Sequence, residues 1–307
     1  MKSILLIVDY FAERWPEWFP LFLESCARNP SIEWIIHTDC PESCAPPRNV
    51  SISKMTWSQY QAHVSHKLGI ALQTDRRYKI CDLRPAYGVI WEDEIARYDF
   101  FGWSDIDLVY GDLRHFLTDA VLAHNVVSTH TWCFSGHLCL LRNRAWVRNA
   151  FRKLPDWRRA MESRENLRYD EDHFFRVFVR PNRYTPAWLK PLVWLADRLD
   201  PFRAKYRNVY LTEQYTTPLV PGLWAESATT RHADVWYWKD GRVTNDQNGD
   251  RQFMYLHFMN YVSARWMDPR YGTRAPWSSI GRLVDFDAAL AGRGFRIGVD
   301  GFRLLDR

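Results

Sequence analysis

The order of apolar and polar positions near the start of the chain predicts two strands with a helix between them. A continuous apolar run of strand length covers Ser3–Val8. A helical pattern follows, which Pro16 can begin and Pro30 ends, and one of its faces carries Phe19, Phe22, Leu23 and Cys26. A second strand is predicted over Glu33–His37. Strand, helix and strand in this order form a βαβ unit, so we expect an α/β fold with a mixed, mainly parallel sheet flanked by helices.

Similar patterns continue to about residue 143. We predict helices over Trp57–Ile70 and Gly88–Tyr98, and strands over Tyr78–Cys81, Phe100–Trp103, Asn125–Ser128 and His137–Asn143. Further along, Asp240 and Gly241 stand between alternating residues and predict a hairpin, and Phe253–Tyr261 reads as a strand.

The character of the chain changes at about Asn182. We predict a core over residues 1–181 and an α+β extension over residues 182–307, together forming one compact unit. The extension begins with a segment rich in Trp, Leu and Pro, around Trp188, Leu192, Val193 and Trp194. This segment is either an amphipathic element that contacts a membrane or a lipid-linked acceptor, or an ordinary packed helical insertion.

Composition narrows the class of partner. The net charge is +5, from 41 Lys and Arg against 36 Asp and Glu, and no nucleic-acid motif accompanies it, so no nucleic-acid partner is expected. The chain holds 16 Trp, 15 Tyr and 17 Phe, a number that fits rings that stack on sugars as well as rings that only pack. Six scattered cysteines indicate reduced thiols and a cytoplasmic protein. The apolar run at the N-terminus is too short for a signal peptide or a membrane span.

Two aspartates, Asp105 and Asp107, follow the predicted strand at Phe100 in the stretch FFGWSDIDLVYGDL. Residues two apart on a strand point to the same side, and open parallel sheets bind ligands at the carboxyl ends of their strands. A divalent cation that bridges phosphates suits such a pair of carboxylates. The third aspartate of the stretch, Asp112, is interpreted as the cap of a following helix.

Three interpretations of the aspartate pair compete. One is structural, with a helix cap and an ion pair to an arginine such as Arg114. The second is an aspartate-dependent phosphatase, whose D-x-D loop normally ends the first strand of its domain. The third is a metal-dependent nucleotide-sugar transferase, whose D-x-D lies midway along its nucleotide-binding domain. The position of Asp105 and Asp107 favours the third.

An ordered set of motifs strengthens that interpretation: VDYF at Val8, Thr38-Asp39, the D-x-D followed by Gly111-Asp112, SGHLCLLRN at Ser135, and YLHF at Tyr255. In this order they resemble a family of bacterial GT-A-type glycosyltransferases associated with surface polysaccharide synthesis. The resemblance covers the first 145 or so residues and the region of His257. Asp9 and Ala12 depart from the pattern.

The resemblance implies a metal site and a donor site. Asp107, with Asp105 directly or through water, and the late His257 would hold Mn²⁺ or Mg²⁺ against the diphosphate of a nucleotide sugar. Imidazole suits Mn²⁺ better than Mg²⁺. Residues near the donor would be Tyr10, Phe11, Asp39, Lys79, Arg84, Asp105, Gly136 and His137, with Lys79 or Arg84 offsetting phosphate charge. On the residues alone, a core histidine is the favoured interpretation of His257, and Asp39 is equally readable as a turn or helix-cap aspartate.

The acids Asp170, Glu171 and Asp172 precede an apolar helical pattern. An inverting transferase would use one of them as general base, a retaining one would need none, and helix capping explains such acids as well. The sequence therefore predicts a glycosyltransferase that uses a nucleotide diphosphate donor, with UDP-sugars favoured. Its acceptor would be a surface polysaccharide or a lipid-linked oligosaccharide, in the cytoplasm or at the inner face of the cell membrane. Rival hypotheses are a non-catalytic carbohydrate-binding protein on the same fold and the phosphatase.

Overall fold

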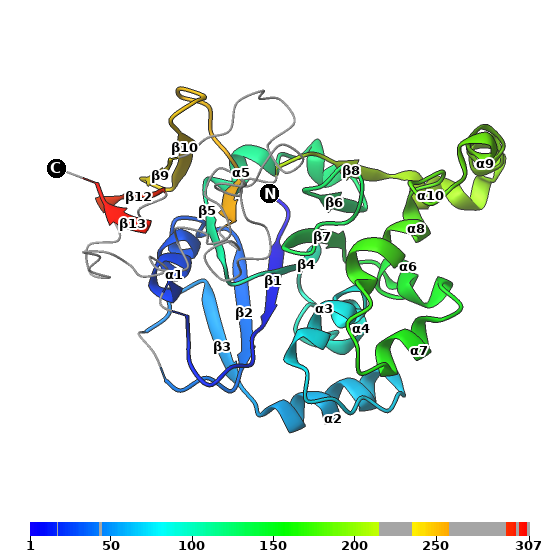
Figure 1. Cartoon of the computed structure of the whole chain (residues 1–307), viewed down its shortest axis with the longest axis horizontal. Helices are drawn as coiled ribbons and strands as arrows, with labels where there is room; N and C mark the ends of the chain where they lie inside the picture. The colour runs from blue at the N-terminus through cyan, green and yellow to red at the C-terminus, as the bar shows by residue number, and fades with distance from the viewer. Residues whose placement is uncertain (17, 43–44, 215–234, 258–292, 299–300, 306–307) are drawn as a thin grey trace, which may run out of the picture.

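A computed structural model describes residues 1–16, 18–42, 45–214, 235–257, 293–298 and 301–305. Its centre is a seven-stranded sheet in the order β3-β2-β1-β4-β7-β6-β8 (Figure 1). The strands are β1 Ile4–Asp9, β2 Glu33–Thr38, β3 Val50–Lys54, β4 Phe100–Ser104, β6 Val126–Ser128, β7 Leu138–Arg142 and β8 Val209–Leu211. Strands β3, β2, β1 and β4 are parallel, and β7 runs antiparallel to both of its neighbours. The predicted mixed, mainly parallel sheet is confirmed.

The apolar run of β1 is continuous because both faces of the sheet are covered. Leu5 and Ile7 belong to one buried cluster, and Ile4, Leu6 and Val8 belong to the other. This division follows from the alternation of side chains along a strand. The first cluster includes apolar residues of α2 (Trp57–Leu68), and the second includes those of α1 (Phe19–Ala27). The predicted βαβ unit is therefore confirmed.

Of the remaining α-helices in the described residues, α9 has ten residues, and the others have four to six. These helices are α3 Ile80–Leu83, α4 Tyr87–Ile90, α5 Leu113–Phe116, α6 Ala145–Arg148, α7 Trp157–Glu162, α8 Phe175–Phe178, α9 Lys190–Leu199 and α10 Ala204–Arg207. Asp112 caps α5 as predicted, because its carboxylate accepts from the backbone N–H groups of Arg114 and His115 at 3.0 and 3.1 Å.

Two element predictions are wrong. The predicted strand Tyr78–Cys81 is a 3₁₀ turn followed by α3, because the buried ion pair of Lys79 with Asp82 needs the i,i+3 spacing of a helical turn. The predicted helix Gly88–Tyr98 is limited to Tyr87–Ile90, because the backbone at Trp91 leaves the helical region at φ −110° and ψ 33°.

The extension adds two small sheets. A four-stranded sheet has the order β10-β9-β12-β13, with β9 Trp236–Lys239, β10 Arg242–Asn245, β12 Phe295–Gly298 and β13 Gly301–Leu304. Its first hairpin turns at Asp240 and Gly241, which have φ values of 51° and 72°, as the sequence predicts. A two-stranded sheet pairs β11 Tyr255–His257 with β5 Leu108–Tyr110. Of the predicted strand Phe253–Tyr261, the part after His257 lies outside the described residues.

Two further predictions can be compared with the described residues. Cys26, Cys40, Cys81, Cys133 and Cys139 are free thiols, and Cys44 lies outside the described residues. In the part of the chain that the structure describes, every helix is too short or too polar to cross a bilayer.

Candidate metal and donor site

The two aspartates lie in the turn between β4 and β5, at the carboxyl end of β4. In the sheet, β4 is the parallel neighbour of β1, and the chain order reverses between these two strands. Open α/β sheets bind ligands at this kind of switch point. The backbone N–H of Asp105 donates to the carbonyl of His137 at 3.0 Å, and the indole of Trp18 donates to the carbonyl of Ile106 at 3.1 Å. These bonds hold the turn from both sides.

His257 reaches the same turn through strand pairing. Strand β11 is antiparallel to β5, and its register places His257 opposite Leu108, the neighbour of Asp107. Gly111, just after β5, permits the close approach of the two segments, because a Cβ there would lie 2.5 Å from the carbonyl oxygen of Phe253. A pairing between residues so distant in sequence therefore completes the cluster.

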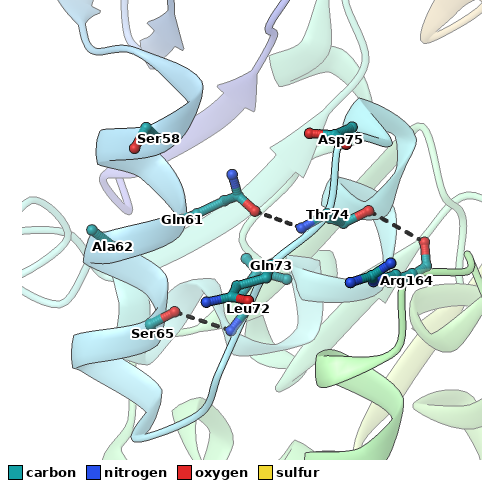
Figure 2. Close-up of a pocket in the computed structure, with 9 residues that line it drawn as sticks. All are labelled: Ser58, Gln61, Ala62, Ser65, Leu72, Gln73, Thr74, Asp75 and Arg164. Carbon is teal, nitrogen blue, oxygen red and sulfur yellow. Dashed lines mark hydrogen bonds between the residues drawn. The ribbon is translucent and has the colours of Figure 1, made fainter.

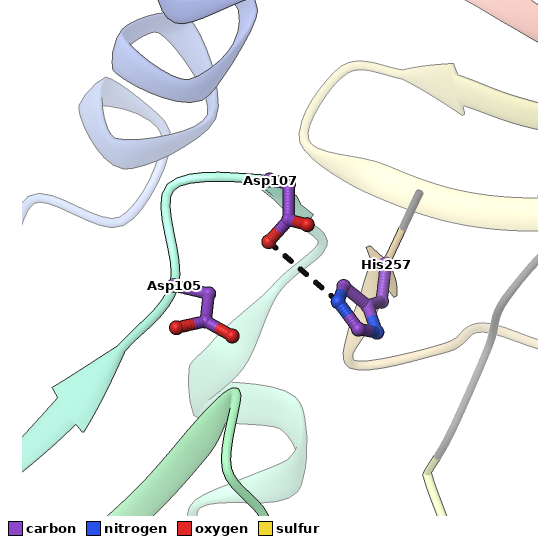
Figure 3. A group of neighbouring side chains, drawn as sticks. All are labelled: Asp105, Asp107 and His257. Atoms are coloured by element: carbon purple, nitrogen blue, oxygen red, sulfur yellow. Dashed lines mark ion pairs between the residues drawn. The ribbon is translucent and has the colours of Figure 1, made fainter. Parts of the chain in front are cut away.

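Asp105, Asp107 and His257 form a compact group of possible metal ligands. One ligand atom of each lies within 4.8 Å of those of the other two, and His257 Nε2 is 3.6 Å from Asp107 Oδ1. Figure 3 shows the imidazole and the two carboxylates around a common space. Two carboxylates and one imidazole are a donor set that suits Mn²⁺, whereas Mg²⁺ prefers oxygen alone. The residues predicted to hold the metal are thus brought together.

The charges of the Asp105 and Asp107 carboxylates favour a cation between them. Burial, and then the neighbouring Asp107 carboxylate, raise the pKa of Asp105, while Arg84 acts in the opposite direction. Two carboxylates this close repel each other unless positive charge lies between them. The guanidinium supplies part of that charge from one side.

The guanidinium of Arg84 bonds to carboxylates and does not face open solvent. Its guanidinium donates to Asp105, to Asp170 at 3.1 Å and to the carbonyl of Gly136, and the residue is buried. Its described contacts join Asp170 to the aspartate pair, and its role in offsetting phosphate charge stays a prediction.

Lys79 also bonds inside the protein. Its side chain is fully buried, and the ammonium donates to Asp82 at 2.7 Å and to the carbonyls of Ala160 and Glu165 at 2.6 and 3.0 Å. An ammonium whose donors are all used inside the protein is not available to a phosphate. The prediction of a donor-site role for Lys79 is therefore wrong for this structure.

The three acids predicted as catalytic lie in a π-helical turn, Tyr169–His173, and not in the first turn of an α-helix. Asp170 is buried, and burial raises its pKa to about 8 even though Arg84 opposes the shift. Glu171 and Asp172 pair instead with arginines, Glu171 with Arg168 at 2.8 Å and Asp172 with Arg183. Of the three, Asp170 alone bonds to the arginine that holds Asp105, within the contacts that the structure records.

Tyr10 and Phe11, the two predicted residues of the loop after β1, differ in their surroundings. Phe11 is buried against Trp57 and Tyr60, with ring centroids 5.3 and 4.9 Å away, so its ring packs in the core, and its place near the donor stays a prediction. Tyr10 is half-buried, and burial, together with the charges of Cys40 and Asp107, raises its pKa to about 12.

Asp39, Gly136 and His137, which were predicted to lie near the donor, have well-defined contacts. The exposed Asp39 carboxylate accepts from the backbone N–H of Ala12 at 3.0 Å and thereby fixes the first loop. A Cβ at Gly136 would lie 2.7 Å from Glu171 Oε1, the end of a flexible side chain that would have to shift. The ring of His137 stacks on His257 with centroids 4.4 Å apart, and its Nε2 is 2.7 Å from the hydroxyl of Tyr255.

That stacking gives His137 a role that the sequence analysis missed. Burial, and then the nearby His257, lower the pKa of His137 well below its usual range, so the ring is neutral and packs against the candidate ligand without adding charge. The signal for this role was the Gly-His dipeptide ahead of β7, on the strand next to the D-x-D strand.

A second buried histidine, His37, lies at the end of β2. Its Nδ1 is 2.7 Å from Asp9 and its Nε2 is 3.1 Å from Glu94, while Trp91 stacks on the ring at 3.7 Å. Burial lowers its pKa, but the two carboxylates outweigh this effect and raise it to about 9. No sequence motif singles out this group, because Asp9, His37 and Glu94 come together only in the folded chain.

We expect this histidine to make stability depend on pH. The pKa of His37 is higher in the folded chain than its ordinary 6.5, so its contribution is complete below pH 6.5 and is lost as pH rises through about 9. The loss is roughly 3 kcal/mol at most. Denaturant unfolding across this range measures it. His37→Gln should be less stable at low pH and show a flatter profile, and an unchanged slope in the variant would contradict the assignment.

A separate open cavity of about 450 Å³ lies between α2, residues 72–75 and Arg164 (Figure 2). Its lining is mainly polar, and the side-chain oxygen of Gln61 accepts a hydrogen bond from the backbone N–H of Thr74 at 2.7 Å. None of the residues that line it belongs to the Asp105–Asp107–His257 cluster.

Three solved glycosyltransferases are similar to the chain. The galactosyltransferase LgtC, in complex with donor and acceptor sugar analogues, is 9% identical at a TM-score of 0.41, over 91% of this chain and 95% of its own. GlyE of Streptococcus pneumoniae is 11% identical at 0.34, over 70% and 45%. Mouse xyloside xylosyltransferase 1 is 10% identical at 0.36, over 73% and 88%. These TM-scores are low, and the α/β fold is defined by the order and directions of the strands in the central sheet.

Among curated proteins, no match to the chain is found. A family model does match, and it covers residues 6–272, most of the chain and all three candidate metal ligands. The chain therefore belongs to DUF6625, a family of unknown function.

Proposed function

We propose that the protein is a metal-dependent glycosyltransferase that moves a sugar from a nucleotide diphosphate donor, UDP-sugars favoured, to a glycan acceptor. The observation that carries the proposal is the convergence of Asp105, Asp107 and His257 at the switch point between β1 and β4. Two carboxylates and an imidazole at that edge of an α/β sheet suit a divalent cation with a diphosphate beside it. The motif resemblance of the sequence agrees with this assignment.

Each residue of the candidate site has its own role in this proposal. Asp105, Asp107 and His257 would hold the metal, Mn²⁺ rather than Mg²⁺, and when bound it would neutralise the charge that develops on the leaving diphosphate. Arg84 fixes Asp105, and the neutral ring of His137 supports His257. Tyr10 and Asp39 stand at the end of β1 and just after β2, where the nucleoside would lie.

Of the three acids, we propose Asp170 as the general base of an inverting reaction, because in the described contacts it alone bonds to the arginine that holds Asp105. It lies behind Arg84, and its pKa of about 8 means that it takes up a proton readily near neutral pH. A base must be unprotonated to begin, so this role predicts turnover that rises as pH rises through about 8. A retaining reaction needs no such base and would lack that dependence on Asp170.

The proposed acceptor is a surface polysaccharide or a lipid-linked oligosaccharide. Its support is the motif resemblance and the abundance of aromatic residues suited to stacking on sugars. We place the reaction in the cytoplasm, which the free thiols fit. The division into a donor-binding part over residues 1–181 and an acceptor-side extension over residues 182–307 belongs to the same proposal.

Slow hydrolysis of donors tests the proposal without an acceptor. The purified protein is incubated with a panel of nucleotide sugars and Mn²⁺, and the products are separated by ion exchange and identified by mass. We expect release of a nucleoside diphosphate from one class of donor, and loss of that release with EDTA. Release of phosphate from simple phosphoesters, lost on Asp105→Asn, would favour the phosphatase. Glycan binding that ignores metal and Asp107→Ala would favour a binding protein.

A further inference from the structure

The helix α9 turns its apolar side chains to solvent, whereas a helix that packs on a core buries them. Of the large apolar side chains that are exposed in the described residues, six lie between residues 188 and 202: Trp188, Leu192, Trp194, Leu195, Leu199 and Phe202. Within α9, Leu192, Leu195 and Leu199 are spaced by three and four residues, which is the spacing of one helical face. Trp188 and Phe202 lie in the 3₁₀ turns that precede and follow the helix. The six side chains expose between 48% and 82% of their surface.

On its opposite side, α9 is attached to the protein through Asp197. Asp197 is buried, and its carboxylate accepts from Nε of Arg203 at 2.7 Å and lies 3.7 Å from Arg207. Arg203 in turn donates to the carbonyl of Val177 in α8 at 2.6 Å. A buried ion pair thus anchors the helix and turns its apolar stripe outwards. Figure 1 shows α9 projecting from the body at the side away from β1, β2 and β3.

Basic side chains accompany the apolar stripe. Lys190, Arg198 and Lys205 are exposed, and the guanidinium of Arg198 lies over the ring of Trp194 at 5.2 Å. The acidic residues between Pro186 and Arg207 are Asp197, which is buried, and Asp200, which caps the next turn by accepting from Phe202 N–H at 2.8 Å. The surface that faces outwards is therefore apolar and positively charged.

We propose that this face, residues 188–205, docks on the surface of an anionic lipid bilayer. Tryptophans beside leucines, with Lys and Arg at the rim, are the chemistry of an interfacial helix. The ten residues of α9 extend about 15 Å, half of a bilayer's hydrocarbon core, so the helix lies in the interface and does not span it. A second copy of the chain fits less well, because a self-complementary contact would bring the same basic groups together.

Docking of this kind would bring the chain to lipid-linked or membrane-attached acceptors, but it does not depend on glycosyl transfer. The experiment therefore contains no donor and no metal, so its failure is distinguishable from the failure of the proposed function.

Flotation with vesicles tests the proposal. We expect the wild type to bind vesicles of phosphatidylcholine mixed with phosphatidylglycerol, to bind phosphatidylcholine alone far less, and to lose binding as salt rises. Leu192→Gln/Leu195→Gln/Leu199→Gln should weaken binding at least about tenfold without changing Tm, because the three side chains are exposed. Lys190→Gln/Arg198→Gln/Lys205→Gln should remove the preference for anionic lipid. Leu167→Gln, at an exposed leucine outside the face, is the control and should bind like the wild type.

Absence of wild-type binding to anionic vesicles overturns the proposal, as does equal binding by the triple leucine variant. If the wild type instead forms a dimer in sedimentation velocity that the leucine variant abolishes, with no vesicle binding, the occupant is a second copy and the proposal is wrong.

Discussion

Replacing Asp107 with alanine should abolish metal-dependent nucleotide binding while leaving the fold intact. Its carboxylate is 3.6 Å from His257 Nε2 and belongs to the one cluster of possible ligands found in the described residues. Removing a direct ligand costs more than removing an outer-shell partner, so we expect the affinity for Mn²⁺ and the release of nucleoside diphosphate to fall at least about 100-fold. Unfolding should change little, because the side chain is not part of the core.

Asp112→Ala is the matched control for this variant. Asp112 is a carboxylate of the same stretch, but it caps α5 and is absent from the cluster. We expect it to lose about 1 kcal/mol of stability and to keep wild-type metal and nucleotide binding. Equal loss of binding in both variants would mean that the whole turn is perturbed, and unchanged binding in Asp107→Ala would remove it from the metal site.

Replacing Lys79 with methionine should destabilise the protein severely without a specific effect on the donor. Both Lys79 and Asp82 are fully buried, so the substitution leaves the Asp82 charge without its ammonium. Breaking such a pair from one side costs about 3–5 kcal/mol. Asp82 keeps the bonds from the backbone N–H groups of Leu167 and Tyr169 at 2.9 and 2.8 Å, which are too few to offset the loss.

Denaturant unfolding measures this effect, and two further variants define it. Lys79→Met/Asp82→Asn removes the unpaired charge and should recover part of the stability. Lys67→Met breaks a surface pair with Glu92 and Asp93 and should cost less than about 1 kcal/mol. A Lys79→Met variant with wild-type stability and weakened UDP binding would restore the phosphate role that the buried geometry contradicts.

The parts of the fold that the sequence predicted are those that local pattern controls. The run Ser3–Val8, the α1 face and the strand at Glu33 obey simple periodicities, and the hairpin at Asp240 follows from turn chemistry. The prediction for Tyr78–Cys81 was wrong because four residues are too few to distinguish a strand from a helical turn by their pattern. The buried pairing of Lys79 with Asp82 decided between them.

The site was predicted through its motifs, but its surroundings were not. The D-x-D and His257 were named because each carries recognisable chemistry, and the pairing of β11 with β5 explains why they meet. The orientation of Phe11 depends on contacts between distant segments. The same is true of the hydrogen bonds that Arg84 donates to Asp105 and Asp170. The outward face of α9 likewise depends on the anchor at Asp197, which no periodicity reveals.

Isothermal titration of the wild-type protein with UDP, with and without Mn²⁺, tests the central claim most directly. A carboxylate–imidazole cluster that binds a metal against a diphosphate predicts saturable UDP binding in the presence of Mn²⁺, weakened at least about tenfold by EDTA. Absence of UDP binding that depends on metal would contradict the assignment of Asp105, Asp107 and His257 as a metal and donor site.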